Sequence, residues 1–211
     1  MTELFEREGV SGVLHRPAGG PAGALLLAHG AGGNRDAKML QRAATEFAER
    51  GLLVLRYDLP FRQRRPKGPP SPSTADQDRR GIAAAAEAMR ELASGPVILG
   101  GHSYGGRQSS MLAAEQPLVC DGLVLFSYPL HPPGKPEKAR TAHLPDLRVP
   151  CVFVHGTRDP FGTPDEMRAA LALVTAPSRL VLVEGTGHDL APDKSEAATL
   201  AALAAVELFD L

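Results

Sequence analysis

Short apolar runs alternate along this chain with longer segments in which apolar residues recur every three or four positions. Continuous apolar runs are typical of strands covered on both faces, and the wider spacing is typical of amphipathic helices. The strand-like runs are at 24–28, 52–55, 97–99, 122–126, 151–154 and 179–183. The helical segments are at 36–50, 76–92, 108–115, 165–174 and 194–209. This alternation predicts an α/β fold with a mainly parallel sheet and helices on both faces.

Residues 3–15 have a different pattern, in which short apolar segments are interrupted by Gly9 and Gly12. We expect an antiparallel pair of strands there, at one edge of the sheet. The chain has 211 residues, no internal repeat and no linker long enough to separate two units. One domain over residues 1–211 is therefore expected.

The loops that leave the carboxyl ends of parallel strands gather along one edge of the sheet, where ligands bind. Six loops of this chain are expected to meet at that edge. They are residues 29–33, 58–67, 102–105, 128–135, 156–161 and 185–189.

One of these loops contains the motif Gly101-His102-Ser103-Tyr104-Gly105, which fits the G-x-S-x-G nucleophile elbow between a strand and a helix. In that elbow the serine occupies a strained turn that lifts its hydroxyl clear of the sheet, and glycines leave room for crowded backbone. The alternative is a glycine-rich turn that only packs tightly. An acid and a histidine on later strand exits would favour the elbow.

A serine hydroxyl needs a base within hydrogen-bond reach, and the base needs a carboxylate to orient it. His188 follows the last predicted strand, and Asp159 follows the strand at 151–154. The order Ser103, Asp159, His188 is that of the nucleophile-elbow enzymes. Asp189 is a weaker candidate acid, because it would have to fold back on its neighbour His188. Asp58 is expected to hold its own loop through an arginine.

Acyl transfer also needs two donors for the developing oxyanion. Tyr104 follows the nucleophile and is expected to supply one backbone amide, and the loop at 29–33 should supply the other. Ala31 is the first candidate in that loop and Gly32 the second. The loop could otherwise be a flexible turn or a phosphate-binding loop, but it lacks the Lys and Ser or Thr of a nucleotide P-loop and the spacing of the dinucleotide motif.

Four segments together, Ala24 to Gly30, Gly100 to Arg107, His155 to Asp159 and Gly185 to His188, resemble the α/β-hydrolases, and more narrowly their small members related to dienelactone hydrolases. The resemblance covers nearly the whole chain. It implies an eight-stranded, mostly parallel sheet whose first two strands come from residues 3–15. It also implies a serine hydrolase that works without a cofactor.

About 24 residues, rich in proline, separate the strands at 122–126 and 151–154. That length is too short for a lid domain, so we expect an open cleft roofed by residues 128–143. Candidate substrate contacts are His29, His102, Tyr128 and, in the basic run 62–67, Arg62 and Arg65. The basic run is either solvated surface or a means of attracting a carboxylate or phosphate on the substrate.

Composition narrows the other possibilities. The net charge is about −1, which gives no electrostatic reason to expect nucleic acid or an anionic membrane as a partner. No apolar run approaches the roughly 20 residues that span a bilayer, and the acidic start lacks the layout of a signal peptide, so a cytoplasmic location is expected. Cys120 and Cys151 are expected to be buried free thiols, and the histidines lack metal-ligand spacing.

These residues lead to the hypothesis of a serine hydrolase that cleaves a small-molecule ester or thioester through an acyl-enzyme on Ser103. One alternative is a catalytically silent interaction module with the same fold. Another is an acyltransferase or peptidase that uses the same three residues. The acyl group, the leaving group and the oligomeric state are not determined by the sequence.

Overall fold

In the computed structural model, which describes residues 1–7 and 9–211, eight strands form one sheet. The strands are β1 (Thr2–Arg7), β2 (Val10–His15), β3 (Gly23–Ala28), β4 (Leu52–Tyr57), β5 (Val97–His102), β6 (Gly122–Phe126), β7 (Cys151–Gly156) and β8 (Ser178–Val183). Their order in the sheet is β1-β2-β4-β3-β5-β6-β7-β8. β1 and β2 pair antiparallel at one edge, β2 pairs antiparallel with β4, and all other pairs are parallel. The mostly parallel sheet and its antiparallel edge are as the sequence predicts.

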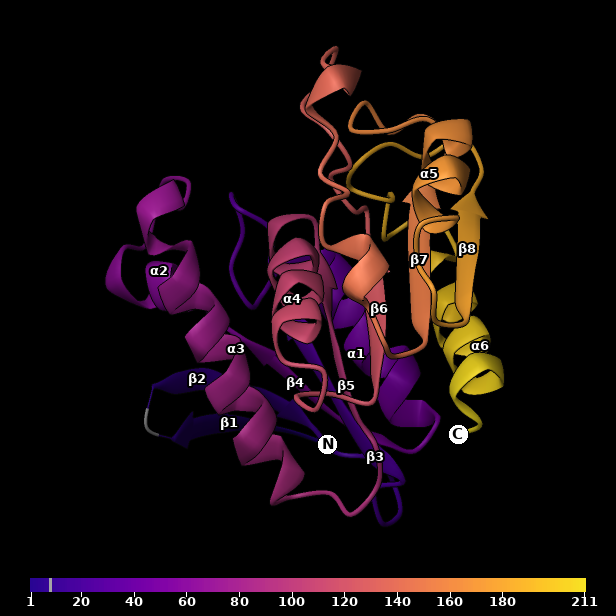
Figure 1. Ribbon diagram of the computed structural model, residues 1–211. Helices are drawn as coiled ribbons and strands as arrows, with labels where there is room; N and C mark the ends of the chain where they lie inside the picture. The colour runs from indigo at the N-terminus through magenta and orange to yellow at the C-terminus, as the bar shows by residue number, and fades with distance from the viewer. Residues whose placement is uncertain (8) are drawn as a thin grey trace.

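Helices cover both faces of this sheet (Figure 1). They are α1 (Lys38–Glu49), α2 (Pro60–Arg64), α3 (Ala75–Arg90), α4 (Tyr104–Glu115), α5 (Pro164–Leu171) and α6 (Ala197–Phe209). α1 and α6 pack on one face, and α3, α4 and α5 pack on the other. The strands in between alternate: Leu26 packs toward α3 and α4, whereas Leu25 and Leu27 pack toward α1 and α6. Burial on both faces explains why these strands are continuous apolar runs.

Two segments differ from the sequence prediction. The segment expected to be a loop at 59–76 contains α2 and a 3₁₀ turn at Pro72–Thr74. Pro60 suits the first position of α2, and the buried Asp78 carboxylate accepts the amide of Phe61 at 3.0 Å. The helix after the serine begins at Tyr104 and not near residue 108. Gly105 and Gly106 are part of its first turn.

The segment that connects β6 to β7 carries only two single 3₁₀ turns, Pro136–Lys138 and Leu144–Asp146. Residues 127–150, all of which the structure describes, therefore hold no lid domain. Across the described ranges, no helix has both the length and the apolar character needed to cross a bilayer.

Candidate active site

Ser103 occupies the turn between β5 and α4 in a strained conformation, with φ of 51°. Its amide donates to the carbonyl of Phe126 on β6 at 2.8 Å, which ties the turn to the sheet. A Cβ at Gly105 would lie 2.5 Å from the carbonyl oxygen of Ala28 on the neighbouring strand, closer than real Cβ contacts. The glycine therefore lets α4 approach β3, and the sharp turn presents the serine side chain at the carboxyl end of the sheet.

The imidazole of His188 lies between Ser103 and Asp159. Its Nδ1 is 2.8 Å from Asp159 Oδ2, and its Nε2 is 2.8 Å from Ser103 Oγ. An ionised carboxylate only accepts hydrogen bonds, so the proton belongs on Nδ1 and Nε2 is left to accept from the hydroxyl. The three residues that the sequence singled out thus meet at one place. They come from the loops that follow β5, β7 and β8.

Asp159 and His188 are held by their surroundings. The Asp159 side chain is fully buried, and its other oxygen accepts the amide of Phe161 at 2.9 Å. The Phe161 ring packs against the His188 imidazole, with 4.2 Å between ring centroids. Asp189, the weaker candidate acid, instead accepts the amide of Ala191 within its own loop.

Two backbone amides near Ser103 are suited to bind an oxyanion. The amides of Ala31 and Tyr104 make no hydrogen bond to any of the described residues. Both residues line the same cavity as Ser103, whereas Gly32 is exposed and lies outside its lining. Tyr104 is also the first residue of α4, where the helix dipole favours negative charge. Of the two candidates in the loop at 29–33, the geometry favours Ala31.

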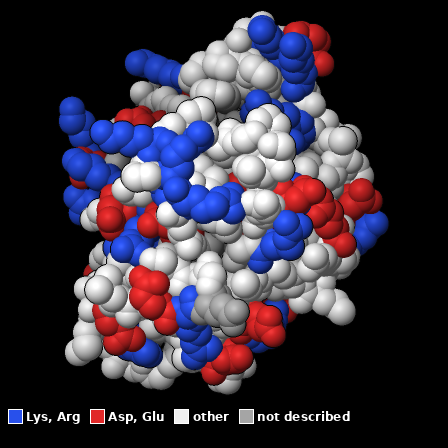
Figure 2. Space-filling model, turned by 90° about the vertical axis from the view of Figure 1, so that its left-hand side faces the viewer, with Lys and Arg blue, Asp and Glu red and all other residues white. Residues whose placement is uncertain are grey.

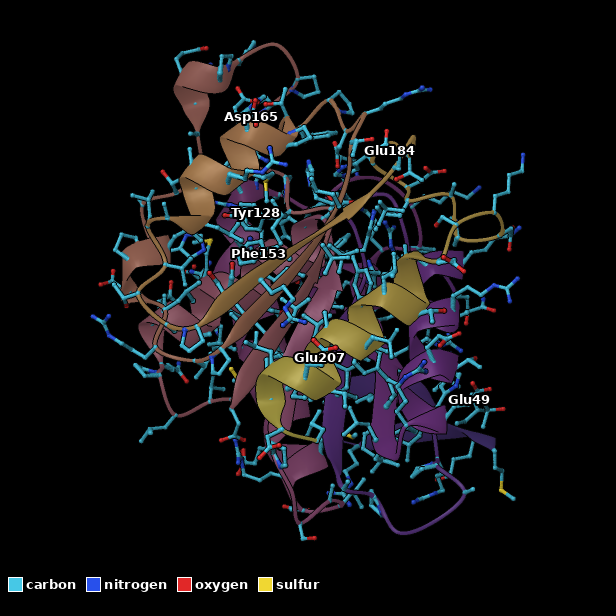
Figure 3. The ribbon with its side chains drawn as sticks, turned by 90° about the vertical axis from the view of Figure 1, so that its right-hand side faces the viewer. Glu49, Tyr128, Phe153, Asp165, Glu184 and Glu207 are labelled. Atoms are coloured by element: carbon cyan, nitrogen blue, oxygen red, sulfur yellow. The ribbon has the colours of Figure 1, made fainter. Side chains whose placement is uncertain are left out.

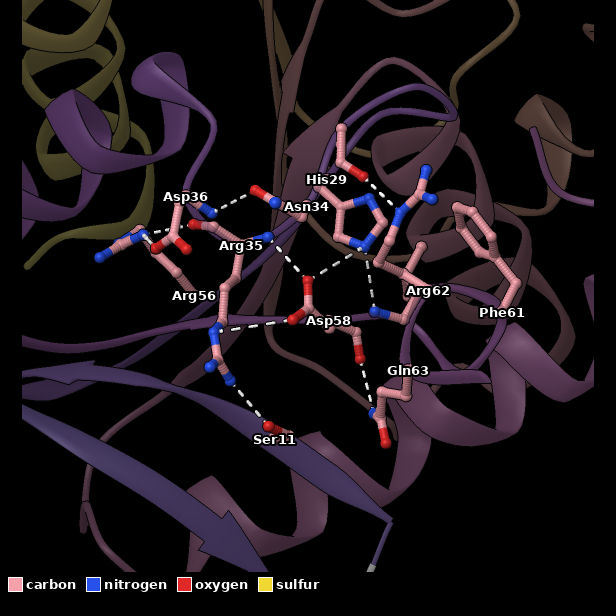
Figure 4. A network of polar contacts seen from close by, with 12 residues as sticks. Ser11, His29, Asn34, Arg35, Asp36, Arg56, Asp58, Phe61, Arg62 and Gln63 are labelled. Atoms are coloured by element: carbon pink, nitrogen blue, oxygen red, sulfur yellow. Dashed lines mark hydrogen bonds and ion pairs between the residues drawn. The ribbon is translucent and has the colours of Figure 1, made fainter. Parts of the chain in front are cut away.

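Two predicted substrate contacts instead support the loop at 29–33 (Figure 4). His29 is fully buried; its Nε2 accepts the amide of Leu59 at 3.1 Å, so Nδ1 carries the proton and donates to the Gly30 carbonyl at 2.9 Å. Burial lowers the pKa of this imidazole, which keeps it neutral. Both ring nitrogens bond to backbone, so the geometry does not support the expectation that His29 touches substrate.

Arg62 is also buried, and its guanidinium donates to four backbone carbonyls. Two of them, Gly33 at 2.7 Å and Ala31 at 3.1 Å, belong to the loop at 29–33. Its donors are directed at backbone, so the geometry supports a role for Arg62 in holding this loop and not the expected substrate contact. Arg65 is exposed, donates to the Pro69 carbonyl and lies outside the lining of the Ser103 cavity.

Asp58 holds its loop through an arginine, as the sequence predicts. Its Oδ1 accepts the amide of Arg35 at 2.8 Å, and its Oδ2 lies 3.6 Å from the guanidinium of the same residue (Figure 4). The carboxylate also lies 3.7 Å from Nε2 of His29. Asp58 therefore fastens the exits of β3 and β4 to each other.

Tyr128 and His102 are placed differently from the sequence expectation. Tyr128 is 1% exposed, packs against Phe153 (Figure 3) and donates its hydroxyl to the Arg140 carbonyl at 2.6 Å, so it supports the roof segment and does not line the cleft. His102 donates from Nε2 to the His188 carbonyl at 2.8 Å. It lines a second cavity, of about 480 Å³, and not the one beside Ser103. His102 therefore positions the loop that carries His188.

The cavity beside Ser103 has a volume of about 630 Å³. Residues 69–72, Pro129 and Phe161 form part of its wall, and α4 contributes Tyr104 and Met111. Arginines also line it, at positions that the sequence reasoning did not single out. Pro69, Pro70, Pro72 and Met111 give the cavity an apolar portion that suits a hydrocarbon chain.

Other reactive side chains lie away from this cavity. Cys120 and Cys151 are both free and buried, as expected, and burial raises the pKa of each thiol to about 12. Neither forms a nucleophilic thiolate near neutral pH. Within the described parts of the chain, no three His, Cys, Asp or Glu side chains are grouped so as to hold a metal ion.

Comparison with known proteins gives matches along most of the chain. A family model described as an alpha/beta hydrolase domain matches residues 21–207. The fold is similar to that of a dienelactone hydrolase from Anabaena variabilis, at a TM-score of 0.73 and 23% identity over 95% of this chain and 91% of that one. Est1E from Butyrivibrio proteoclasticus gives a TM-score of 0.76 and 16% identity, covering 100% and 99% of the two chains.

An alpha-beta serine hydrolase homologue from Coxiella burnetii matches with a TM-score of 0.72 and 16% identity, over 100% of this chain and 97% of that one. At such identities the likeness of the structures establishes the fold, and the family model adds the relationship in sequence. The elbow, the sheet order and the matched span agree, and on these grounds the chain belongs to the alpha/beta hydrolase family.

Proposed function

We propose that this hydrolase cleaves a small ester or thioester through an acyl-enzyme on Ser103. The observation that carries the proposal is the placement of His188, with one ring nitrogen 2.8 Å from the Ser103 hydroxyl and the other 2.8 Å from the buried Asp159 carboxylate. This arrangement lets a neutral imidazole accept a proton from the serine while the carboxylate stabilises the resulting cation.

The reaction proceeds in two halves. Ser103 Oγ attacks the substrate carbonyl carbon while His188 Nε2 takes the hydroxyl proton, and the carbonyl oxygen becomes an oxyanion that the amides of Ala31 and Tyr104 bind. The tetrahedral intermediate then expels the alcohol or thiol, which receives the proton from His188. In the second half, water attacks the acyl-enzyme with His188 as base, and Ser103 recovers its proton as the carboxylic acid leaves.

The silent-module alternative is less well supported by the geometry. A fold that has lost catalysis need not keep a serine in a strained turn, a histidine at hydrogen-bond distance from it and two free amides together. An acyltransferase or peptidase would use the same groups, and nothing in the cavity favours either over hydrolysis.

Covalent labelling tests the proposal directly. A fluorophosphonate probe should label the wild-type chain on Ser103, and Ser103→Ala should abolish the labelling. A panel of p-nitrophenyl esters graded by chain length, together with acyl-CoA thioesters, should then show which class is turned over. A folded wild-type chain that is neither labelled nor active on any of these substrates would contradict the proposal.

A further inference from the structure

One face of α4 forms part of the wall of the cavity beside Ser103. Ser103, Arg107 and Met111 are spaced four residues apart and all line this cavity. Because α4 begins at Tyr104, Arg107 lies one helical turn, about 5.4 Å along the axis, from the nucleophile. Residues at this spacing lie on the same side of a helix, so the side chain of Arg107 begins near Ser103, where the substrate carbonyl would react.

Charge in this cavity is unbalanced. Among the described residues, its lining holds three arginines, Arg79, Arg107 and Arg140, and a single carboxylate, Asp76. Figure 2 shows basic side chains gathered across the upper middle of the face on which α2 and α3 lie. Arg79 is neutralised, since it pairs with Asp76 and, at 3.0 Å, with Glu115.

Arg107 and Arg140 have no such partner. Among the described residues no carboxylate lies within 4.0 Å of either guanidinium. The Nε of Arg107 is buried and makes no hydrogen bond to any described residue. Leaving a buried donor of a charged group unpaired is costly, so the described protein does not fully satisfy this guanidinium, although Arg107 lines the cavity.

The positive charge of Arg107 lowers the pKa of two neighbouring side chains. Burial and then the Arg107 charge lower the pKa of the Arg140 guanidinium, and the same two causes lower the pKa of His143 to about 4. His143 is thus neutral and bonds through Nε2 to Ser110 at 2.9 Å. The groups that face Arg107 from the roof segment are therefore a cation and neutral side chains, and none supplies a negative charge.

Arg140 is held in place by hydrogen bonds to the roof segment, residues 128–143. Its amide donates to Leu130 at 2.7 Å, its carbonyl accepts the Tyr128 hydroxyl at 2.6 Å, and its Nη1 donates to Pro129 at 3.0 Å. These contacts involve the backbone and one nitrogen, which leaves the remaining guanidinium donors for the cavity. A preorganised arginine loses less conformational entropy when it binds an anion.

We propose that Arg107 and Arg140 together bind a carboxylate carried by the substrate, in the same cavity as Ser103. The inference rests on the proposed function and specifies its substrate class, an ester or thioester that also bears an acid. Planar guanidinium groups match the two oxygens of a carboxylate. The proline-rich wall and Met111 would pack on the hydrocarbon chain between the two functional groups.

The kinetic test uses matched substrates. p-Nitrophenyl hydrogen adipate carries the carboxylate on the acyl side, and its methyl ester is the neutral match; 4-carboxyphenyl butyrate and its methyl ester do the same for the leaving-group side. The wild type should prefer one charged substrate to its neutral match. Arg107→Gln and Arg140→Gln should each reduce kcat/KM for that substrate about ten- to a hundredfold and change the neutral one less than about threefold.

Arg80→Gln is the matched control. Arg80 lies on α3 beside Arg79, is exposed and is not part of the cavity lining, yet the substitution removes the same charge. It should leave both substrates unaffected. Equal kcat/KM for charged and neutral substrates in the wild type, or a preference that persists in both cavity variants, would overturn the assignment.

A binding measurement separates this inference from the proposed reaction. Calorimetry on Ser103→Ala should detect monomethyl adipate and not dimethyl adipate, and adding Arg107→Gln should weaken the binding at least tenfold. Tighter binding of methyl phosphate than of monomethyl adipate would contradict the carboxylate assignment. If fluorophosphonate labelling fails while this binding persists, the reaction is wrong and the anion site stands.

Discussion

Replacing Arg62 by methionine tests whether the Ala31 amide depends on this guanidinium for its position. Arg62 donates hydrogen bonds of 2.7–3.1 Å to the carbonyls of Gly33, Arg65, Ala31 and Gly68. Methionine keeps an apolar stem of similar length and donates nothing. The loop at 29–33 and the segment after α2 would therefore lose the group that joins them.

The size of the effect follows from these contacts. A hydrogen bond from a charged donor contributes about 1.5–3 kcal/mol, and contributions within one cluster do not add. We expect Arg62→Met to lower the free energy of unfolding by about 2–4 kcal/mol and the Tm by about 4–15 °C. The loss in kcat has a ceiling of about a hundred- to a thousandfold, which is the cost of removing one oxyanion donor.

Steady-state kinetics on a neutral p-nitrophenyl ester, well below the Tm of the variant, provides the assay. We expect kcat to fall about a hundredfold and KM to change less than about threefold, because the Ala31 amide acts on charge that develops only in the transition state. Arg62→Lys should be intermediate, since an ammonium cannot reproduce the planar fork. Arg65→Met is the control. A folded Arg62→Met that keeps kcat within about threefold of wild type would refute the reasoning.

Three further predictions follow from the same structure. Asp159→Asn should lower kcat by about a thousand- to ten-thousandfold, since an amide no longer holds the correct tautomer of His188; a loss below tenfold would argue against this role. Gly105→Ala places a methyl group 2.5 Å from a backbone carbonyl, so the Tm should fall and fluorophosphonate labelling should slow. An unchanged Tm and an unchanged labelling rate would contradict the close packing of α4 on β3. Burial, and then the charge of Arg56, lower the pKa of His15 to about 4. Between about pH 6.5 and pH 4 the unfolded chain therefore binds a proton that the folded chain does not, and the free energy of unfolding decreases as the pH is lowered. His15→Gln should reduce that slope by about 1.4 kcal/mol per pH unit in denaturant titrations between about pH 6 and 4.5, and equal slopes would exclude the effect.

Local patterns were sufficient for most of the fold. The apolar runs predicted the strands because a strand buried on both faces needs apolar side chains at every position. The spacing around Ser103 predicted a strand, a turn and a helix because the elbow is defined by backbone crowding between near neighbours in sequence. The helix start at Tyr104 was missed, since glycines are poor helix formers and only packing against β3 explains them there.

The roles of individual polar side chains were harder to predict. Arg62 was interpreted as a substrate contact because it stands in a basic run, but its donors are used by carbonyls about thirty residues away in sequence. Tyr128 was interpreted as a substrate contact because it begins the segment expected to roof the cleft, but its side chain is buried and its hydroxyl donates to the Arg140 carbonyl. Arg107 carried no signal beyond a positive charge after a motif. Whether an arginine is paired depends partly on carboxylates from other elements, as with Glu115 of α4 for Arg79, and sequence spacing does not report those.

The sequence by itself determined the α/β architecture, the order of the candidate catalytic residues and the edge of the sheet where they meet, because these depend on periodicity and on short motifs. Only the tertiary structure decided which side chains face the cavity and which hold its loops. The physical reason is that a hydrogen-bond donor serves whichever acceptor the packed chain brings within about 3 Å. For Arg62 that acceptor is backbone. The buried Nε of Arg107 has none within the described protein.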